Sequence, residues 1–316
     1  MTSMVNTTLS TGINSMMTTD PQNLRTSNPE NPDEYHIVLL VIYSVVLLTG
    51  IISLSMMTHI LKSSTTSITS IAVLNLIFTH FIFLVTVPFR IYYYATQHWS
   101  LGHWWCKFVS GMIHIHMYMS FIFYVIILIT RLMTFYYKAE RVASLQKIHA
   151  LVLSVIVWMV VLVVVPCIIH FLYGKKIEDR FYGNNATTNV TECFKFGNNI
   201  ESASKVFNYI ISTVIIVVAT VLTALQSNAL SVLYRKHRQG WTSQQDFGAQ
   251  LNSLCFALIM VVCFIPYHLF RLHYLEHLDR QSINEVFLSL TTFGCLDMLT
   301  FLGRRTCYMC LPGKAI

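Results

Sequence analysis

The sequence predicts an all-α membrane protein whose main domain is a bundle of seven transmembrane helices. Of the 316 residues, 54% are hydrophobic and only 11% are charged, and the mean hydropathy is +0.57. A soluble domain carries about 25% charged residues. Seven stretches are also apolar over the roughly 20 residues that a helix needs to cross a bilayer. We therefore expect most of the protein surface to face hydrocarbon.

The seven predicted spans follow one another along most of the chain. The fifth is long enough to project beyond the membrane, and Asp297 makes the seventh the weakest. Before the spans, residues 1–35 are rich in Ser, Thr and Asn and predict a disordered extracellular tail. The helical domain covers 36–303 and is followed by a short cytoplasmic tail, 304–316. The spans lie at about residues 36–61, 69–95, 107–137, 149–173, 204–234, 250–276 and 284–303.

Several other classes of protein do not fit this composition. The formal net charge is +7, but the charges lie in loops and form no basic stripe interleaved with aromatics, so nucleic-acid binding is not expected. We find no Ser/His/Asp arrangement and no metal-ligand cluster, so we expect neither an enzyme nor a cofactor nor a metal site. The last span has no lysine for a retinal Schiff base, and the two halves lack the repeats of a transporter.

Glycosylation sequons decide the predicted orientation better than the basic residues do. Lys and Arg are almost evenly divided between the two faces, so their distribution hardly favours either orientation. Asn6, Asn185 and Asn189 begin Asn-X-Thr sequons, in the N-terminal tail and in the loop between spans four and five. An even number of spans separates these segments, so both can be glycosylated in the lumen. We expect an extracellular N-terminus, a cytoplasmic C-terminus and a plasma-membrane location.

Two cysteines are candidates for a disulfide bond. Cys106 begins span three, and Cys193 lies in the loop before span five. Both would lie on the extracellular side, where a disulfide is stable. Two unpaired thiols are the alternative. A bond between them would hold the long loop over the mouth of the bundle.

Motifs spread over five parts of the chain resemble those of the rhodopsin-like (class A) G-protein-coupled receptors. Arg131 follows Cys106 by 25 residues, about 37 Å of helix, so the two mark opposite faces of the membrane. The resemblance extends over all seven spans and is nearest to the branch with nucleotide and lysolipid receptors. It implies an extracellular ligand, a heterotrimeric G protein as partner, and a switch around Phe264 and Pro266. The motifs are Asn75-Leu76, Trp99-x-Leu101-Gly102-x-x-x-Cys106, Arg131, Trp158 and Cys263-Phe264-Ile265-Pro266-Tyr267.

The resemblance assigns Arg131 a role in holding the resting state and then receiving the G protein. The family's Asp/Glu-Arg-Tyr motif reads Thr130-Arg131-Leu132 here, so the local counter-charge is missing. Asp246, 20 residues before Pro266, matches the family's second partner of this arginine. We hypothesise that Asp246 alone pairs with Arg131; the alternative is a solvated acid that contributes little.

The polar positions in the middle of the bundle also depart from the family. His80 stands where the family carries a sodium-binding Asp, and Ser120 and Asp297 match two other members of that sodium site. An imidazole in place of the carboxylate is expected to bind sodium poorly. We expect a His80–Asp297 hydrogen bond to replace the ion, although each group could be satisfied separately. The family's Asn/Asp-Pro-x-x-Tyr reads Asp297-Met298-Leu299-Thr300-Phe301, without the proline that forces a kink.

The residues near the extracellular face favour an anionic small molecule or lipid as ligand. Ile113 stands where amine receptors carry an Asp, so an amine is not expected. His268 and Arg271 share one face of span six, and with Tyr267 they resemble nucleotide and acidic-lipid receptors, in which the arginine holds phosphate or carboxylate. Arg90 and Arg271 could instead extend to lipid headgroups. The other candidates are Arg90, Lys107, His114, Tyr118 and Lys195, and for His114 and Tyr118 a role in the core is the alternative.

The two tails and the altered motifs leave further possibilities. Asp33-Glu34-Tyr35 would suit a peptide ligand, which is the alternative ligand class. Cys307 and Cys310, just after the last span, are candidate palmitoylation sites. The altered motifs around Arg131 and Asp297 favour the alternative function: a receptor-like scavenger or dimer partner that does not itself signal.

Overall fold

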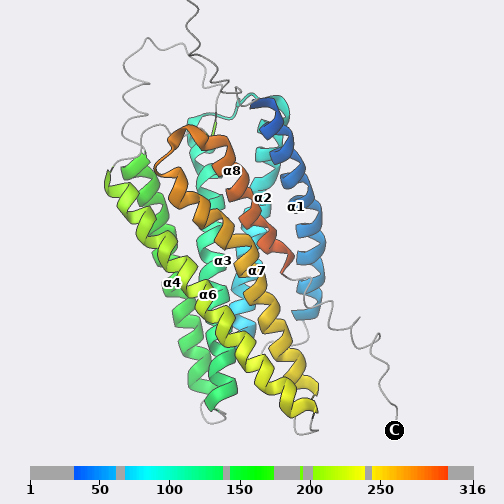
Figure 1. The fold of residues 1–316 in the computed structure, drawn as a ribbon. Coiled ribbons are helices and arrows are strands. Elements are labelled where there is room, and N and C mark those ends of the chain that lie inside the picture. Colours follow the sequence, from blue (N-terminus) through cyan, green and yellow to red (C-terminus); the bar gives the residue numbers. More distant parts are fainter. Residues whose placement is uncertain are drawn as a thin grey trace, which may run out of the picture. The chain divides into compact units, whose positions relative to one another are not determined.

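The structure, a computed structural model, describes residues 32–61, 68–137, 143–173, 193–194, 202–238 and 244–297. In these ranges the chain forms seven α-helices, which confirms the predicted all-helical class, and two short 3₁₀ helices. Successive helices run in alternating directions within one bundle (Figure 1). They are α1 (Pro32–Leu61), α2 (Ile68–Thr96), α3 (His103–Tyr137), α4 (Ala143–Tyr173), α6 (Ser202–Arg238), α7 (Gln244–Tyr274), η1 (Leu278–Arg280), α8 (Gln281–Leu290) and η2 (Thr291–Leu296).

The surface of the bundle is that of a membrane protein. Five of the described helices are long and apolar enough to cross a bilayer, and α4 adds the shorter apolar stretch Leu151–Cys167. Exposed hydroxyls bond within their own helix: Thr49 Oγ1 donates to Val45 O at 2.6 Å, and Thr213 Oγ1 to Tyr209 O at 2.8 Å. Because lipid offers no hydrogen-bond partners, polar groups on such a surface must be satisfied internally.

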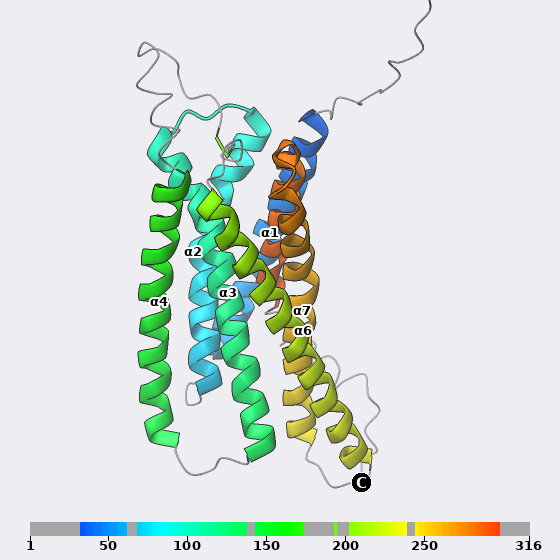
Figure 2. The ribbon, with the colours of Figure 1, turned by 60° about the vertical axis from the view of Figure 1, so that its left-hand side comes forward.

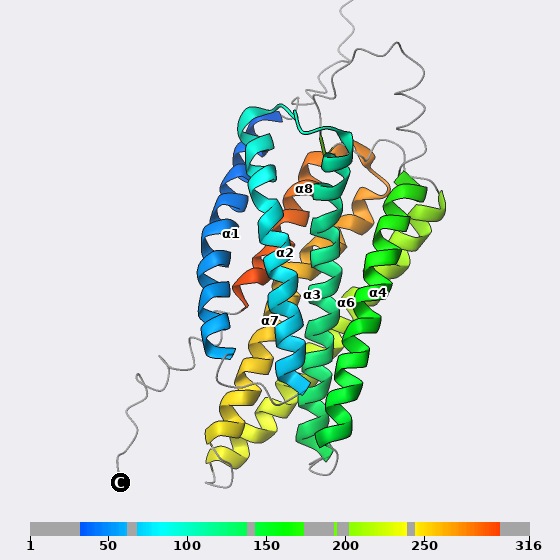
Figure 3. The same ribbon diagram turned by 180° about the vertical axis from the view of Figure 1, so that it is seen from behind.

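Helix α3 lies at the centre of the bundle. It contacts α2, α4, α6, α7 and η2, and the view from behind shows it between α2 and α4, with α6 and α7 on its other side (Figure 3). Its residues Ile113, Met117 and Phe123 are fully buried. At the edge of the bundle (Figure 2), α4 is joined to α2 through Asn75, which receives a hydrogen bond from Trp158 Nε1 at 2.9 Å and donates one to Ser154 Oγ at 3.0 Å.

The seventh segment differs most from its prediction. We expected one span over 284–303, but the α-helix begins at Gln281, ends at Leu290 and continues as the 3₁₀ helix η2. Thr291 and Thr292 lie at this change, and their hydroxyls donate to the carbonyls three residues back, Leu288 O and Ser289 O, both at 2.6 Å. Such local side-chain bonds compete with regular α-helical bonding. Residues 298–303 lie outside the described part of the chain.

The first helix also begins earlier than predicted, at Pro32 rather than at about residue 36. Proline is favoured at the first helical position because the N–H it lacks has no partner there. Further along α1, Gly50 allows a close approach to α2: a Cβ at this position would lie 2.8 Å from Leu84 Cδ2. A larger residue at position 50 would therefore require the Leu84 side chain to move.

Candidate functional site

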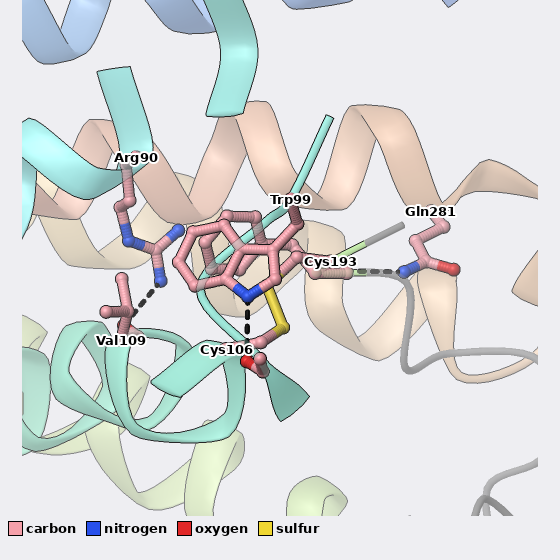
Figure 4. The surroundings of a disulfide bond; sticks show 8 residues. Arg90, Trp99, Cys106, Val109, Cys193 and Gln281 are labelled. Atoms are coloured by element: carbon pink, nitrogen blue, oxygen red, sulfur yellow. Dashed lines mark hydrogen bonds between the residues drawn. A yellow bond between two sulfur atoms is a disulfide. The ribbon is translucent and has the colours of Figure 1, made fainter. Parts of the chain in front are cut away.

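A disulfide bond joins Cys106, at the start of α3, to Cys193, which confirms the predicted pairing (Figure 4). The chain enters α3 through Gly102, whose φ of +83° favours glycine. The Gly102 carbonyl accepts a hydrogen bond from Trp99 Nε1 at 2.8 Å. The disulfide is thus attached to a turn that is itself fixed by a buried tryptophan.

Phe194, the residue after Cys193, is carried by the disulfide against Arg90 of α2. Its side chain is buried, and the Arg90 guanidinium carbon lies 4.5 Å from the centre of its ring. The Phe194 carbonyl accepts a hydrogen bond from Gln281 Nε2 at 3.0 Å, at the start of α8 (Figure 4). The loop segment at residues 193–194 therefore connects α2, α3 and α8 at the disulfide end of the bundle.

Arg90 is completely buried, at 0% exposure. It donates from Nη1 to Tyr43 Oη at 3.3 Å and from Nη2 to Val109 O at 3.1 Å. Its Nε has no hydrogen-bond partner in the part of the chain that the structure describes. The alternative in which Arg90 extends to lipid headgroups is wrong, because the guanidinium lies between α1, α2 and α3.

Arg271 is also enclosed by the bundle, with 8% of its surface exposed. Its guanidinium donates to Asn208 Oδ1 of α6 and Asn284 Oδ1 of α8, both at the long distance of 3.4 Å, and its carbon lies 5.2 Å from the centre of the Tyr274 ring. One turn earlier on α7, the buried His268 lies with Nδ1 3.2 Å from Ser212 Oγ. Arg271 therefore does not extend to lipid either.

These side chains form a group that we call the basic cluster: Arg90, His114, His268, Arg271 and Glu285. His114 is close enough to interact electrostatically with both arginines and with His268. Glu285 of α8 interacts with both arginines. The cluster thus holds two guanidinium groups, two imidazoles and one carboxylate.

The other predicted ligand residues lie in different surroundings. Tyr267 is buried and its ring is 4.9 Å from that of His268, and Tyr118 is partly buried and packs against the core. The Lys107 ammonium lies 5.5 Å from the centre of the ring of Trp104, a side chain that is 78% exposed. Lys195 lies outside the described residues. The structure thus brings together Arg90, His114, His268 and Arg271, with Tyr267 beside them.

A second buried group, which we call the polar core, lies among α2, α3 and η2. Its members are His80, His116, Ser120, Tyr124, Cys295 and Asp297. His80 Nε2 is 3.3 Å from Asp297 Oδ2, so the two side chains expected to pair lie within hydrogen-bonding distance. Tyr124 Oη donates to the same carboxylate oxygen at 2.7 Å. His80 Nδ1 lies 2.9 Å from His116 Nε2. Ser120, also expected here, is buried, and its hydroxyl has no hydrogen-bond partner.

Phe264 packs beside the polar core on the helix that also carries His268 and Arg271. It is fully buried on α7, two residues before Pro266, and its ring centre lies 5.9 Å from that of Phe121 and 6.1 Å from that of Tyr124. Through Tyr124 it adjoins the polar core, and along α7 it lies one turn from His268. This position fits the switch role that the resemblance implies.

At the opposite end of α3, Arg131 is partly buried and Thr130 bonds its own helix, from Oγ1 to Ile126 O at 2.7 Å. Asp246 lies in the first turn of α7, but its side chain is outside the described part, so its pairing with Arg131 stays a prediction.

A contact that we had not predicted lies near Arg131. The buried Gln226 of α6 donates to Leu128 O of α3 at 3.0 Å and accepts a hydrogen bond from Gln250 of α7.

Several predicted sites lie outside the described residues and stay predictions. They are the glycosylation sites Asn6, Asn185 and Asn189 and the palmitoylation candidates Cys307 and Cys310. Other residues were missed by sequence reasoning, namely Asn208, Asn284, Glu285, His116 and Cys295. Polar groups inside an apolar span are costly unless they are partnered, and this signal could have identified Asn208 and Glu285.

Comparison with known proteins agrees with this architecture. Residues 53–300 match the family model "7 transmembrane receptor (rhodopsin family)". The chain is 37% identical over 273 residues to the human "Probable G-protein coupled receptor 141", covering 83% of this chain and 87% of that protein. It is 24% identical to mouse "Probable G-protein coupled receptor 34", covering 87% and 76% of the two chains. It is 25% identical to rat "2-oxoglutarate receptor 1", covering 75% and 68%. With its helical bundle and its family match, the chain belongs to the rhodopsin family of seven-transmembrane receptors.

Proposed function

We propose that this chain is a plasma-membrane receptor, with its N-terminus outside, that transmits the binding of an anionic small molecule or lipid to heterotrimeric G proteins. The observation that carries the proposal is the basic cluster at the disulfide end of the bundle. Membership of the rhodopsin family supports the receptor role.

The charge of the basic cluster favours an anion. Arg90 and Arg271 each carry a full positive charge, because guanidinium groups stay protonated in proteins. Glu285 is the carboxylate that interacts with both of them. Buried charges are costly unless they are balanced by charges of opposite sign. Within the basic cluster two guanidinium groups and one carboxylate leave an excess of positive charge, which would attract an anionic ligand.

The geometry at Arg271 favours carboxylate or phosphate. Its two terminal nitrogens are directed at two different amide oxygens, each 3.4 Å away. Such long contacts can be exchanged for shorter, charge-assisted bonds to a ligand, and a guanidinium can bind both oxygens of a carboxylate or phosphate at once. The name of the rat relative, a receptor for the dicarboxylate 2-oxoglutarate, agrees with this ligand chemistry.

A conformational change that starts at the basic cluster would reach the opposite end of the bundle along α7. His268 and Arg271 lie one to two turns from Phe264, which packs on Tyr124 of the polar core. Beyond it, Gln250 and Gln226 connect α7 and α6 to α3 near Arg131. A ligand that draws Arg271 toward itself would displace α7, and that movement would reach the end at which the G protein binds.

The proposal is tested by a G-protein dissociation panel in cells that carry the receptor at their surface. The probes are 2-oxoglutarate and other dicarboxylates, nucleotides and lysophospholipids, and a cationic amine serves as the negative control. We expect one or more anions, and not the amine, to dissociate a G protein. Silence across all G-protein classes, with receptor present at the surface, would favour the alternative of a scavenger or dimer partner.

A further inference from the structure

The polar core contains three metal-ligating side chains that no part of the proposed function uses. His80 of α2, His116 of α3 and Cys295 of η2 are all buried, and their donor atoms lie within 4.8 Å of one another. The Cys295 sulfur is 3.6 Å from His80 Nδ1 and 3.5 Å from His116 Nε2, and the two nitrogens are 2.9 Å apart. We propose that these three residues form a site for a zinc ion.

The distances between the donor atoms fit tetrahedral zinc. Zinc lies about 2.0 Å from an imidazole nitrogen and about 2.3 Å from a thiolate, which places a nitrogen and a sulfur ligand about 3.6 Å apart and two nitrogens about 3.3 Å apart. Both nitrogen–sulfur distances in the polar core already match this value. Only the two imidazoles must separate, by about 0.4 Å from their present 2.9 Å.

The surroundings of His80 are those of a metal ligand. A metal-bound histidine usually donates its other ring nitrogen to a carboxylate, which fixes the ring and its tautomer. His80 has this arrangement: its Nδ1 faces the site while its Nε2 lies 3.3 Å from Asp297 Oδ2, and that oxygen also accepts the Tyr124 hydroxyl. The carboxylate is thus held from two sides.

The protonation of His116 would change when zinc binds. If the neutral His80 donates from Nε2 to Asp297, its Nδ1 is an acceptor, and His116 must donate to it from Nε2. His116 Nδ1 is then an unprotonated nitrogen, and this buried atom has no hydrogen-bond partner among the described residues. Zinc binding at Nε2 moves the proton to Nδ1, so this atom stays without a described partner, and the gain comes from the coordination bonds that replace the weak contacts among the three donors.

Chemistry and charge select zinc over the sodium ion that the family's matching site binds. Two imidazoles and a thiolate are ligands for zinc and softer metals, whereas sodium-like hard cations bind oxygen. The thiol loses its proton on binding. The two positive charges of zinc are then offset by the Cys295 thiolate and the Asp297 carboxylate, so the occupied site is neutral, as a buried site requires.

Zinc here would act as an allosteric ligand. The ion ties α2 and α3 to η2 beside Tyr124, on which Phe264 packs. A ligand stabilises the conformation that binds it better, so zinc would favour the arrangement in which the three helical segments are in contact. The site is independent of the basic cluster, and its test requires neither an anionic ligand nor a G protein.

The experiment measures metal content in the purified full-length receptor in lipid nanodiscs. The protein is stripped with a chelator, incubated with Zn²⁺ and desalted, and zinc per receptor is measured by mass spectrometry. Co²⁺ is used in parallel, because a cobalt–thiolate bond gives a charge-transfer absorption. The site variants are Cys295→Ser and His116→Phe, which keeps an aromatic ring on Phe83. The matched controls are Cys167→Ser, at an exposed cysteine, and His273→Ala with His277→Ala, at an exposed histidine pair.

We expect one zinc ion per receptor in the wild type and in both controls, and loss of zinc in both site variants. The cobalt–thiolate absorption should disappear in Cys295→Ser, and Asp297→Asn should weaken zinc binding about 10- to 100-fold. A monomeric elution profile of each variant checks its folding, and Cys295→Ala replaces any variant that fails this check. The proposal is overturned if wild type holds no more zinc than Cys295→Ser, or if its zinc is lost in the His273 and His277 control.

Discussion

His80 Nε2 and Asp297 Oδ2 are 3.3 Å apart, and both side chains are buried between α2 and the end of the seventh segment. The resemblance to class A receptors predicted this contact, because His80 stands where that family carries a carboxylate. The structure adds Tyr124, which donates to the same oxygen, and so makes α3 a third participant. Buried polar side chains that share one carboxylate oxygen in this way contribute to stability as a unit.

We therefore predict that His80→Asn and Asp297→Asn have non-additive effects on stability. Removing either partner leaves the other buried without its partner, so the second substitution costs less than the first. A double-mutant cycle on thermal unfolding in nanodiscs, with chelator present, should give a coupling of about 1–3 kcal/mol. As a control, Asp297→Asn combined with Thr213→Ala on the exposed face of α6 should be additive. Additivity in both cycles would show that the two side chains do not act as a pair.

A second prediction concerns the contact of Gln226 with Gln250 and with the Leu128 carbonyl. The contact joins α6 and α7 to α3 close to Arg131, and Gln226 is fully buried. Gln226→Leu removes two hydrogen bonds, each of which contributes about 1 kcal/mol, and a total of about 2 kcal/mol corresponds to about a 30-fold change in a conformational equilibrium. Basal G-protein dissociation should therefore rise by about 5- to 30-fold, whereas the exposed Asn228→Ala should leave it unchanged. Equal basal signals for Gln226→Leu and wild type, at equal surface expression, would show that this contact does not stabilise the resting state.

The predicted Arg131–Asp246 pair is tested in the same assay. Asp246→Ala removes the one acid that the resemblance offers to Arg131, so the resting state should become less stable and basal signalling should rise. The exposed Glu276 near the opposite end of α7 provides a control, Glu276→Ala. An unchanged basal signal in Asp246→Ala would mean that Asp246 is a solvated acid.

A fourth prediction concerns the disulfide. Cys106 and Cys193 are separated by 87 residues, and closing a loop of that length stabilises a protein by about 4–5 kcal/mol in the chain-entropy account. The bond also holds Phe194 against Arg90. The double variant Cys106→Ser, Cys193→Ser should therefore lose thermal stability and surface expression. Cys167→Ser, at an exposed free cysteine, should retain both. Unchanged stability of the double variant would show that the loop is held without the bond.

The fold was largely predictable, because a membrane-spanning helix requires a long apolar stretch and such stretches can be read directly from the sequence. A span needs about 20 consecutive apolar residues, and the ends of six of the seven predicted spans agree with those of α-helices to within six residues. The seventh was predicted less well, because the hydroxyls of Thr291 and Thr292 bond the chain locally at the point where the α-helix ends. Hydropathy does not report such side-chain bonds.

The candidate sites were predictable only in part, because their members come from separate helices. Arg271 and His268 share a helix and could be found from their spacing. Glu285 and Asn284 of α8 join them only through the folding of the bundle. His116 and Cys295 were missed for the same reason: a histidine in α3 and a cysteine in η2 look like ordinary core residues until the structure places them beside His80.

The central claim is that Arg271 recognises an anion, and it is tested most directly by concentration–response curves for Arg271→Gln. The matched control is Arg280→Gln, which removes an exposed arginine near the same end of the bundle. With 2-oxoglutarate, or whichever anion of the panel is active, Arg271→Gln should need about 10- to 100-fold more ligand, since a charge-assisted hydrogen bond contributes about 1.5–3 kcal/mol. Arg280→Gln should match wild type. Equal curves for Arg271→Gln and wild type, at equal surface expression, would contradict the account.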